Sequence, residues 1–413
     1  MSQLNLVPTL RFTEFNSPWN LEKLGSFYTF KNGVNADKDQ YGKGTKFINV
    51  LDVLQPYPIT SDSIKGKVEV NEKTLEKNAV INGNLLFQRS SETREEVGTS
   101  NVYLGDRTVT FGGFVIRGTP VQQVNPIYMN YLLKSSKARK EIVTKSGGST
   151  RYNVGQETLS SVSIIVSDVD DEQQKIADFL TTTDIKIGQL TEKHRLLKEY
   201  KKGVMQQIFS QQLRFKDANG NVFPDWGNKS LNQLASKITT KNKGRLVKVA
   251  LTNSAKHGIM SQQDYFEKDI AKGDNTDNYC VVDINDFVYN PRISELAPVG
   301  PIGRNKIEKG VMSPLYSVFR FNPGICLDFI EYFFKGTTWH KYMHSVANFG
   351  ARHDRMNISS ADLMALPCPF PCVEEQKEIA CFLQSIDSKV EGVAIQIKQT
   401  KQFKKGLLQQ MFV

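Results

Sequence analysis

Several short stretches of the chain hold residue types that could do chemistry, but each lacks part of what that chemistry needs. An enzyme that methylates a base amine holds the amine with an acidic or amide residue, two prolines and an aromatic ring. The nearest match, "SPLY" at 313–316, has one proline and no acid or amide. Neither "FGG" at 111–113 nor "YGKGTKF" at 41–47 has the glycine spacing of a dinucleotide or phosphate loop. Both glycine stretches are therefore interpreted as strand turns.

Three groups of residues suggest a metal ion, and none completes a known ligand set. The stretch 375–377 has the Glu-x-Lys spacing of a magnesium-dependent nuclease, but the repeat described below places Gln174 where this lysine stands. His340 and His344 are four residues apart on an expected helix, without a third ligand. "CPFPC" at 368–372 has no second cysteine pair at finger-like spacing. We predict no metal on this chain.

Length, charge and cysteine content narrow the class of protein. A chain of 413 residues is too long for one ordinary core and predicts several domains. The net charge of +10 favours a polyanionic partner, with nucleic acid preferred over a role in solubility alone. The first residues lack the pattern of a signal peptide, no apolar run approaches membrane-spanning length, and the odd cysteine count fits reduced thiols. These features predict a cytoplasmic protein.

A phrase near the middle of the chain recurs close to its end. "DEQQKIADFL" at 171–180 aligns with "EEQKEIACFL" at 374–383, an offset of 203 residues. The same offset continues without a gap, so that "YKKGVMQQIF" at 200–209 lies over "FKKGLLQQMF" at 403–412. The beginnings of the two halves repeat too, with "LRF" followed by a tryptophan and then a leucine in each. The chain is therefore interpreted as two copies of one plan.

The elements that must position any functional residue follow from periodicity. Short β-branched and aromatic runs such as "KFINVLDV" (46–53) and "TVTFGGFVIRG" (108–118), broken by glycine and asparagine, predict mixed α/β domains with many strands. Amphipathic patterns predict helices within 125–142 and 324–343. The stretch 214–226 is expected to be an interdomain linker.

The repeated segments are expected to be long helices that pair as a coiled coil. Their apolar residues recur at steps of three, four or seven, and no proline interrupts them. Polar residues in the seam, Lys201 and Lys404 among them, can fix its register. The predicted seam comprises Ile176, Leu180, Ile187, Leu190, Leu197, Val204 and Ile208 in the first copy, and Ile379, Leu383, Ile386, Val390, Val393, Ile397, Leu407 and Met411 in the second.

This plan, with two related phrases that open two long helices, resembles the specificity subunit of a type I restriction-modification enzyme. The resemblance implies an α/β (α+β) fold in which two globular target-recognition domains, in a pseudo-two-fold repeat, are separated by an antiparallel coiled coil of two long helices. Each domain would read one half of an asymmetric, split double-stranded DNA site. One departure from an even repeat is that "LSSVSIIVSDVDD" (159–171), before the first helix, lacks the prolines of "LMALPCPFPCV" (363–373), before the second.

The resemblance also implies the partners and the absence of catalytic residues on this chain. Two modification subunits would bind S-adenosylmethionine and methylate adenine at N6, and restriction subunits would use ATP and magnesium. The expected domains are a lead-in at 1–16, target-recognition domain 1 at 17–167, a central helical region at 168–211, target-recognition domain 2 at 212–370 and a C-terminal helical region at 371–413.

Candidate DNA-binding residues come from polar loops that hold glycine for close backbone approach and arginine for phosphate or guanine. The first choices are Ser149, Arg151 and Asn153 in the first half, and Arg352, His353 and Arg355 in the second. The second choices are Lys46, Arg89, Arg117, Lys241, Lys243, Arg292 and Arg304. For any single one of them, an ordinary solvated charge is an equal interpretation.

Two other function classes stay open at this point. A self-contained methyltransferase or nuclease would need a catalytic site of unrecognised form, and methyl transfer by the purified chain would reveal it. A coiled-coil scaffold that does not bind DNA would explain the repeat but not the positive charge, and failure to bind duplex DNA would favour it.

Overall fold

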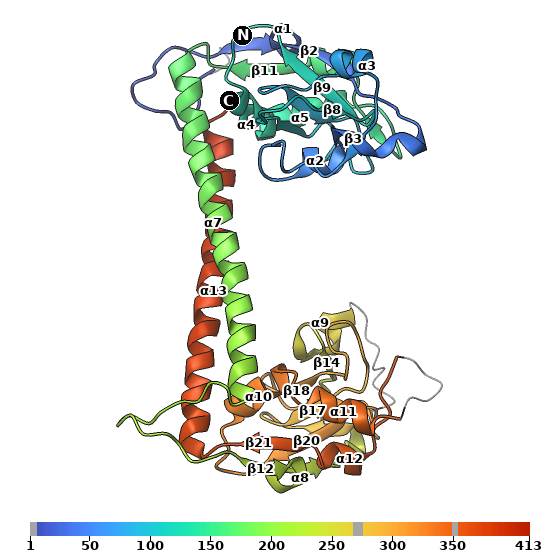
Figure 1. Ribbon diagram of the computed structural model, residues 1–413, viewed down its shortest axis with the longest axis vertical. Coiled ribbons are helices and arrows are strands. Elements are labelled where there is room, and N and C mark those ends of the chain that lie inside the picture. The colour runs from blue at the N-terminus through green and yellow to red at the C-terminus, as the bar shows by residue number, and fades with distance from the viewer. Residues whose placement is uncertain (1–5, 267–275, 349–353) are drawn as a thin grey trace. The chain divides into compact units, whose positions relative to one another are not determined.

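The computed structural model describes residues 6–266, 276–348 and 354–413 (Figure 1). The chain divides into two compact units, of which unit 1 comprises residues 1–192 and 394–413 and unit 2 comprises residues 193–393. Each long helix contributes one part to each unit. Among the described residues, no helix is long and apolar enough to cross a membrane.

Unit 1 is built around a four-stranded antiparallel sheet of order β2-β9-β5-β7. A three-stranded sheet of order β4-β3-β8 and two pairs, β1-β11 and β6-β10, accompany it. Its strands are β1 Asn20–Lys23, β2 Tyr28–Asn32, β3 Tyr41–Ile48, β4 Lys67–Val68, β5 Leu85–Gln88, β6 Ser90–Ser91, β7 Ser100–Val102, β8 Thr110–Phe111, β9 Val115–Pro120, β10 Tyr152–Asn153 and β11 Ser163–Val166. Its short helices are α1 Leu24–Phe27, α2 Val50–Leu54, α3 Glu72–Lys77, α4 Pro126–Lys134, α5 Ser136–Lys145 and α6 Gln156–Ser161, with a 3-10 turn at Lys38–Gln40.

Unit 2 has a four-stranded antiparallel sheet of order β13-β20-β17-β18. Three strand pairs, β12-β21, β14-β15 and β16-β19, complete it. Its strands are β12 Gly227–Ser230, β13 Ala235–Ile238, β14 Leu251–Ser254, β15 Gly258–Ser261, β16 Cys280–Val282, β17 Phe287–Tyr289, β18 Ile302–Arg304, β19 Gly310–Met312, β20 Ser317–Phe321 and β21 Pro367–Phe370. Its short helices are α8 Leu231–Leu234, α9 Gln262–Phe266, α10 Leu327–Lys335, α11 His340–Val346 and α12 Ser360–Met364, with a 3-10 turn at Lys243–Arg245.

The long helices are α7, Asp170–Phe209, and α13, Val373–Gln410. In unit 1 the beginning of α7 meets the end of α13, where Lys404 Nζ lies 2.6 Å from Asp184 Oδ1. In unit 2 the end of α7 meets the beginning of α13, where Lys201 Nζ lies 2.5 Å from Asp387 Oδ1. Pairing of one helix's beginning with the other's end is antiparallel. The polar seam residues Lys201 and Lys404 thus form ion pairs.

The predicted seam residues divide between the cores of the two units. Within unit 1, one apolar cluster joins Ile176, Leu180, Leu407 and Met411 to Trp19 and the residues of α4. Within unit 2, a second cluster joins Val204, Ile208, Ile379, Leu383 and Ile386 to the aromatic side chains of β17, β20 and α10. Ile187, Leu190 and Val393 are buried, whereas Leu197, Val390 and Ile397 are half-buried. The helix ends therefore belong to the domain cores as well as to a helix pair.

Some local expectations are corrected by capping and backbone geometry. The run 46–53 was expected to be strand, but Asn49 Oδ1 accepts hydrogen bonds from the backbone N–H groups of Leu51 and Asp52 and starts α2. Helix is found in the expected range 125–142, where the extended backbone of Ser135 ends α4 and its side chain caps α5. The stretch 41–47 is a bulged part of β3 rather than a turn. In the first and third of these stretches a local hydrogen bond or bulge outweighs the wider pattern.

Candidate nucleic-acid interface

A buried glutamate at the start of α7 ties the N-terminal lead-in to unit 1. Glu172 is fully buried. Its Oε1 accepts a hydrogen bond from Arg11 Nε at 2.6 Å, and its Oε2 accepts one from Trp19 Nε1 at 3.0 Å. Ser167 Oγ donates to Oε2 at 2.6 Å. The hydrogen bond to Glu172 raises the pKa of Arg11, so this arginine is a fixed structural cation.

Unit 2 repeats the same arrangement at the start of α13. Arg214 Nε donates to Glu375 Oε1 at 2.9 Å, and Trp226 Nε1 donates to Glu375 Oε2 at 2.8 Å. The two ends of the expected linker 214–226 are therefore fastened to α13. In each half of the chain, the arginine of the "LRF" phrase and the tryptophan that follows it bind the glutamate at the start of a long helix. Arg11 and Arg214 are therefore not free to bind DNA.

The glutamine after each glutamate makes a second repeated contact. Gln173 Oε1 accepts a hydrogen bond from the backbone N–H of Asn125 at 2.9 Å, just before α4. Gln376 Oε1 accepts one from the backbone N–H of Cys326 at 3.0 Å, just before α10. The Glu-x-Lys spacing at 375–377 therefore belongs to a structural junction. In the described part of the chain, no group of three or more His, Cys, Asp or Glu side chains is placed to hold a metal.

In unit 1 the predicted loop presents one exposed arginine. Backbone hydrogen bonds between Gly147 and Asn153 close the loop. Arg151 is exposed and lies 4.0 Å from Glu92, which is itself exposed, and Ser149 is also exposed. Asn153 Oδ1 accepts a hydrogen bond from Ser90 Oγ at 2.5 Å. Arg151 and Ser149 are thus available for phosphate or base contacts, whereas Asn153 is partly engaged.

In unit 2 the predicted loop is only partly described. Arg352 and His353 lie outside the described residues. Arg355 forms a backbone bridge with Arg292, so the structure brings these two candidates together. The Arg355 side chain is 26% exposed and its Nε lies 3.6 Å from Asp354 Oδ2, whereas Arg292 is exposed. Arg292 is the freer of the two.

Three second-choice residues of unit 1 donate hydrogen bonds to backbone carbonyls of the same unit. Lys46 Nζ donates to the carbonyl of Ser61 at 2.5 Å, and Arg89 Nη1 donates to the carbonyl of Gly113 at 3.2 Å. Arg117 Nη1 donates to the carbonyl of Ala79, and burial lowers the pKa of Arg117. These contacts occupy donors that a phosphate would need.

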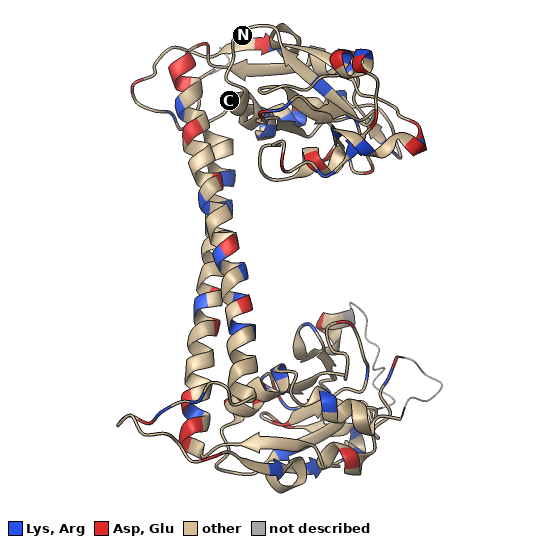
Figure 2. Ribbon diagram, in the orientation of Figure 1, with Lys and Arg blue, Asp and Glu red and all other residues tan. Residues whose placement is uncertain are grey.

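Among the second choices in unit 2, Arg304 is engaged and two lysines are exposed. Arg304 Nη1 lies 2.7 Å from Asp328 Oδ1, and its side chain is 13% exposed. Lys241 and Lys243 are exposed beside the 3-10 turn. They fit a phosphate contact better than Arg304 does. Figure 2 shows basic and acidic residues intermixed along the ribbon of both units, so that the charge colouring alone does not single out one segment.

A groove in unit 2 contains the candidate Arg304 together with three lysines that sequence reasoning missed. It measures about 620 Å³ and lies between the β14–β15 turn, β18 and the end of α10. We call it the hairpin groove; its charged side chains are Lys256, Arg304, Lys306, Glu331 and Lys335, with His257 and His340 beside them. Lysines and arginine outnumber the single carboxylate, which favours an anionic ligand. The polar turn "AKHG" at 255–258, between two apolar runs, was the available signal.

Glycine and asparagine shape the floor of the hairpin groove. A Cβ at Gly303 would approach Asn253 Oδ1 to 2.7 Å, so a larger residue would displace this amide. Asn253 Nδ2 donates to the carbonyls of Val288 and Pro301 at 2.8 and 3.1 Å. Within the described residues, the buried Oδ1 of Asn253 has no hydrogen-bond partner. The exposed Lys256 and His257 stand on the turn above this floor.

We expect Lys256→Ala to weaken duplex binding because a phosphate contact is lost. The slope of log affinity against log salt should become shallower by about 1. Fluorescence anisotropy of a labelled duplex over a salt series measures this slope. Lys309→Ala is the matched control, since Lys309 is an exposed lysine of the same unit, lies outside the hairpin groove and is paired with Asp283. Equal slopes for the two variants would remove Lys256 from the interface.

Comparison with known proteins gives one consistent family. Residues 16–199 match the model of the type I restriction modification DNA specificity domain. A protein of Methanocaldococcus jannaschii, named as the specificity subunit of the type I restriction enzyme MjaX, is 24% identical over 96% of this chain and 93% of its own length.

Solved structures show the same fold. The S subunit of a type I restriction-modification system from M. genitalium superposes with a TM-score of 0.54 at 12% identity, covering 98% of this chain and 99% of that one. A chain from a study of complex assembly in a type I R-M system gives a TM-score of 0.55 at 15% identity, with 95% and 98% covered. The HsdS subunit of Thermoanaerobacter tengcongensis gives 0.50 at 15%, with 95% and 96% covered. The predicted mixed α/β fold with a long helical segment is confirmed.

Proposed function

Since residues 16–199 are a type I restriction modification DNA specificity domain, we infer that this chain is the subunit that recognises the DNA sequence in a type I restriction-modification enzyme. The observation that carries this inference is the family match, which is joined by sequence similarity over 96% of the chain to a protein named as a specificity subunit. The alternatives of a self-contained enzyme or a scaffold without DNA are not favoured.

We propose that the DNA site has two unlike halves, each read by one domain within the ranges 17–167 and 212–370. The sheets of the two units have corresponding strand orders, and the contacts of Glu172 recur at Glu375. The surfaces that carry the basic candidates differ, with an arginine loop in unit 1 and the hairpin groove in unit 2. A shared framework with different surfaces suits two half-sites of different sequence.

Catalysis is assigned to partner subunits. The sequence has no complete motif for a methyl donor, a nucleotide or a catalytic metal. Modification subunits would supply S-adenosylmethionine and transfer its methyl group to adenine N6, and restriction subunits would supply ATP-driven cleavage with magnesium. The repeated helices α7 and α13 offer two equivalent attachment points, which supports two modification subunits per chain.

Reconstitution tests this function. The chain co-purified with its host's modification subunit should methylate adenines in a split motif, which methylation-sensitive sequencing of DNA exposed to the complex would map. The chain alone should bind duplex DNA and transfer no methyl group from labelled S-adenosylmethionine. Methyl transfer by the isolated chain, or methylation by the complex without any sequence preference, would refute the assignment.

A further inference from the structure

A short loop of unit 2 holds a leucine in solvent among lysines. We call residues 241–248, "KNKGRLVK", the basic loop, which lies between β13 and β14. The Leu246 side chain is 86% exposed, and three exposed lysines surround it in sequence, Lys241, Lys243 and Lys248. Among the described residues, no carboxylate forms an ion pair with any of these lysines. The basic loop thus combines one projecting apolar group with unneutralised cations.

Hydrogen bonds fix the shape of the basic loop. Asn242 is buried; its Nδ2 donates to the carbonyl of Val247 at 2.8 Å, and its Oδ1 accepts from the N–H of Val247 at 3.0 Å. Asp277 Oδ1 accepts a hydrogen bond from the Gly244 N–H at 3.2 Å, and Asp277 Oδ2 lies 2.6 Å from Arg245 Nε. Arg245 has a φ of 54°, in the left-handed region that residues other than glycine rarely adopt. These contacts hold a strained backbone so that its leucine stays outside the core.

Unit 1 has a corresponding feature after its own 3-10 turn. The turns Lys38–Gln40 and Lys243–Arg245 each follow the first strand in the order of a four-stranded sheet, β2 or β13. The residue after the turn is Tyr41 in unit 1, which is 44% exposed, and Leu246 in unit 2. Single exposed apolar side chains are common on proteins. Recurrence at the same place in two units with different sequences indicates a shared use.

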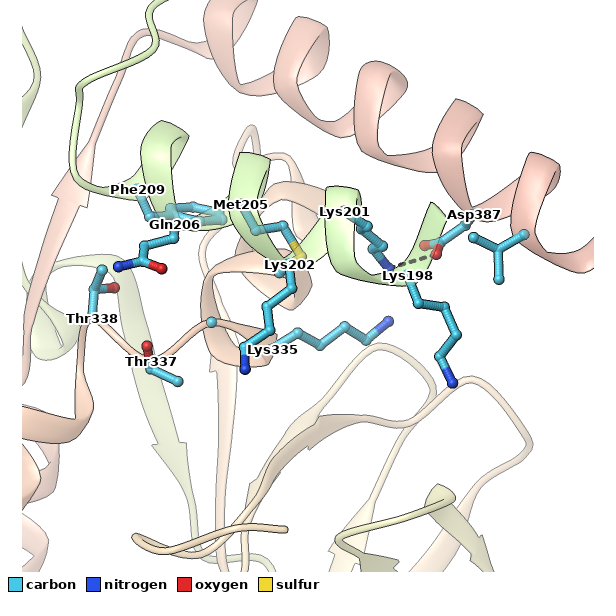
Figure 3. Close-up of a pocket in the computed structure, with 12 residues that line it drawn as sticks. Lys198, Lys201, Lys202, Met205, Gln206, Phe209, Lys335, Thr337, Thr338 and Asp387 are labelled. Carbon is cyan, nitrogen blue, oxygen red and sulfur yellow. Dashed lines mark hydrogen bonds and ion pairs between the residues drawn. The ribbon is translucent and has the colours of Figure 1, made fainter. Parts of the chain in front are cut away.

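Apolar side chains beside lysines elsewhere in unit 2 are recessed. Figure 3 shows Met205 and Phe209 of α7 at a hollow of about 380 Å³, which Lys202 and Lys335 also line. Met205 and Phe209 are 7% and 3% exposed. Such a hollow can receive an apolar group but cannot insert one. Leu246 projects from the basic loop instead, so that it can enter a gap in a partner.

We propose that Leu246 is a wedge that enters between two base pairs of the DNA bound by unit 2, while Lys243 and Lys248 contact phosphates on either side. This inference rests on the function proposed above. DNA offers both chemistries together, because phosphates flank its grooves and the faces of its stacked bases are apolar. Proteins insert leucine at base steps in this way and kink the duplex by about 20–90°. A lipid surface also pairs charge with an apolar interior, but a helix that binds one presents a whole apolar face rather than a single leucine.

Substitutions in the basic loop separate the wedge from the cations. The variants are Leu246→Ala, Leu246→Met, and Lys243→Ala with Lys248→Ala. The control is Ile284→Ala, because Ile284 is an exposed apolar residue of the same unit, at 55%, and follows Asp283 rather than a lysine. The full chain is used without modification subunits, since a methyltransferase would itself unstack its target base.

Three measurements are made on a duplex that carries the split motif found by methylation mapping. Fluorescence anisotropy over a salt series gives the affinity and its salt dependence. Energy transfer between dyes at the two ends of the duplex gives the bend. The fluorescence of 2-aminopurine, placed at each adenine in turn, reports an unstacked step. Cosedimentation with phosphatidylglycerol vesicles tests the lipid alternative.

The unaltered chain, Ile284→Ala and Leu246→Met should bend the duplex and brighten 2-aminopurine beside one base step. Leu246→Ala should lose both signals and about tenfold in affinity, with an unchanged salt slope because no charge is lost. The double lysine variant should instead make the slope shallower by about 2.

A bend and a brightening that survive Leu246→Ala would overturn the wedge and leave DNA recognition intact. An unbent duplex together with vesicle binding that requires Leu246 would overturn it in favour of a lipid contact. If the unaltered chain binds no duplex at all, the proposed function fails and the wedge fails with it.

Discussion

Glu172→Ala is expected to destabilise unit 1 by about 3–5 kcal/mol, the cost of removing one partner from a buried ion pair. The carboxylate is fully buried and accepts hydrogen bonds from Arg11, Trp19 and Ser167. Alanine would leave the Arg11 guanidinium, whose side chain is 9% exposed, without its counter-ion. The indole N–H of Trp19 would lose its acceptor as well. Urea unfolding followed by tryptophan fluorescence measures the loss.

Glu14→Ala serves as the control for this prediction. Glu14 is paired with Lys175, but both side chains are 47% exposed, and exposed pairs contribute little to stability. The unfolding midpoint of this variant should stay close to that of the unaltered chain. Glu172→Gln should fall between the two, because the amide keeps an acceptor but lacks the charge. Equal stability of Glu172→Ala and Glu14→Ala would show that the buried glutamate does not hold the lead-in.

The long helices could be predicted from the sequence because their signal is extended and doubled. The expected central helical region, 168–211, encloses the observed α7, Asp170–Phe209, and apolar spacing over nearly forty residues leaves little ambiguity. Short elements were harder. The run 46–53 has the composition of a strand, but Asn49 caps a short helix, α2, that begins within it. The strand propensity of eight residues does not reveal such a cap.

The role of the seam residues was less visible than their spacing. Ile176 and Leu407 contact the core of unit 1, and Ile208 and Ile379 contact the core of unit 2. Periodicity shows which face of a helix is apolar, but not whether a second helix or a domain covers it. The sequence shows Trp19 and Trp226 as a repeated pair. Only the fold shows the reason for this repeat, which is that each indole N–H donates a hydrogen bond to a buried glutamate near the start of a long helix.

The candidate DNA-binding residues show that residue type alone does not reveal which cations the fold already uses. Lys46, Arg89 and Arg117 have suitable side chains, but backbone carbonyls distant in sequence occupy their donors. These acceptors come from loops that only the folded sheets bring close. Lys256 was missed for the opposite reason, since it is an ordinary lysine in a short turn until the hairpin groove forms around it.

Leu383→Asp is expected to be the second severe substitution, with a loss of several kcal/mol for a buried charge that has no partner. Leu383 is fully buried and belongs to the apolar cluster that joins α7 and α13 to the domain core of unit 2. A charge there would disrupt both the helix pair and the core. Thermal unfolding followed by circular dichroism should show a much lower transition temperature for unit 2, and binding of the proposed split DNA site should be lost.

The equivalent substitution in unit 1 and an exposed control separate the role of burial from that of helix charge. Leu180→Asp should act on unit 1 as Leu383→Asp acts on unit 2, because Leu180 is fully buried beside Leu407 and Met411. Ile185→Asp places the same charge on α7 at a side chain that is 55% exposed and should change the unfolding transition little. Leu→Ala at either buried site removes the apolar contacts without adding a charge, at about 2–5 kcal/mol. If Leu180→Asp and Leu383→Asp unfold no more easily than Ile185→Asp, these leucines do not join the long helices to the domain cores.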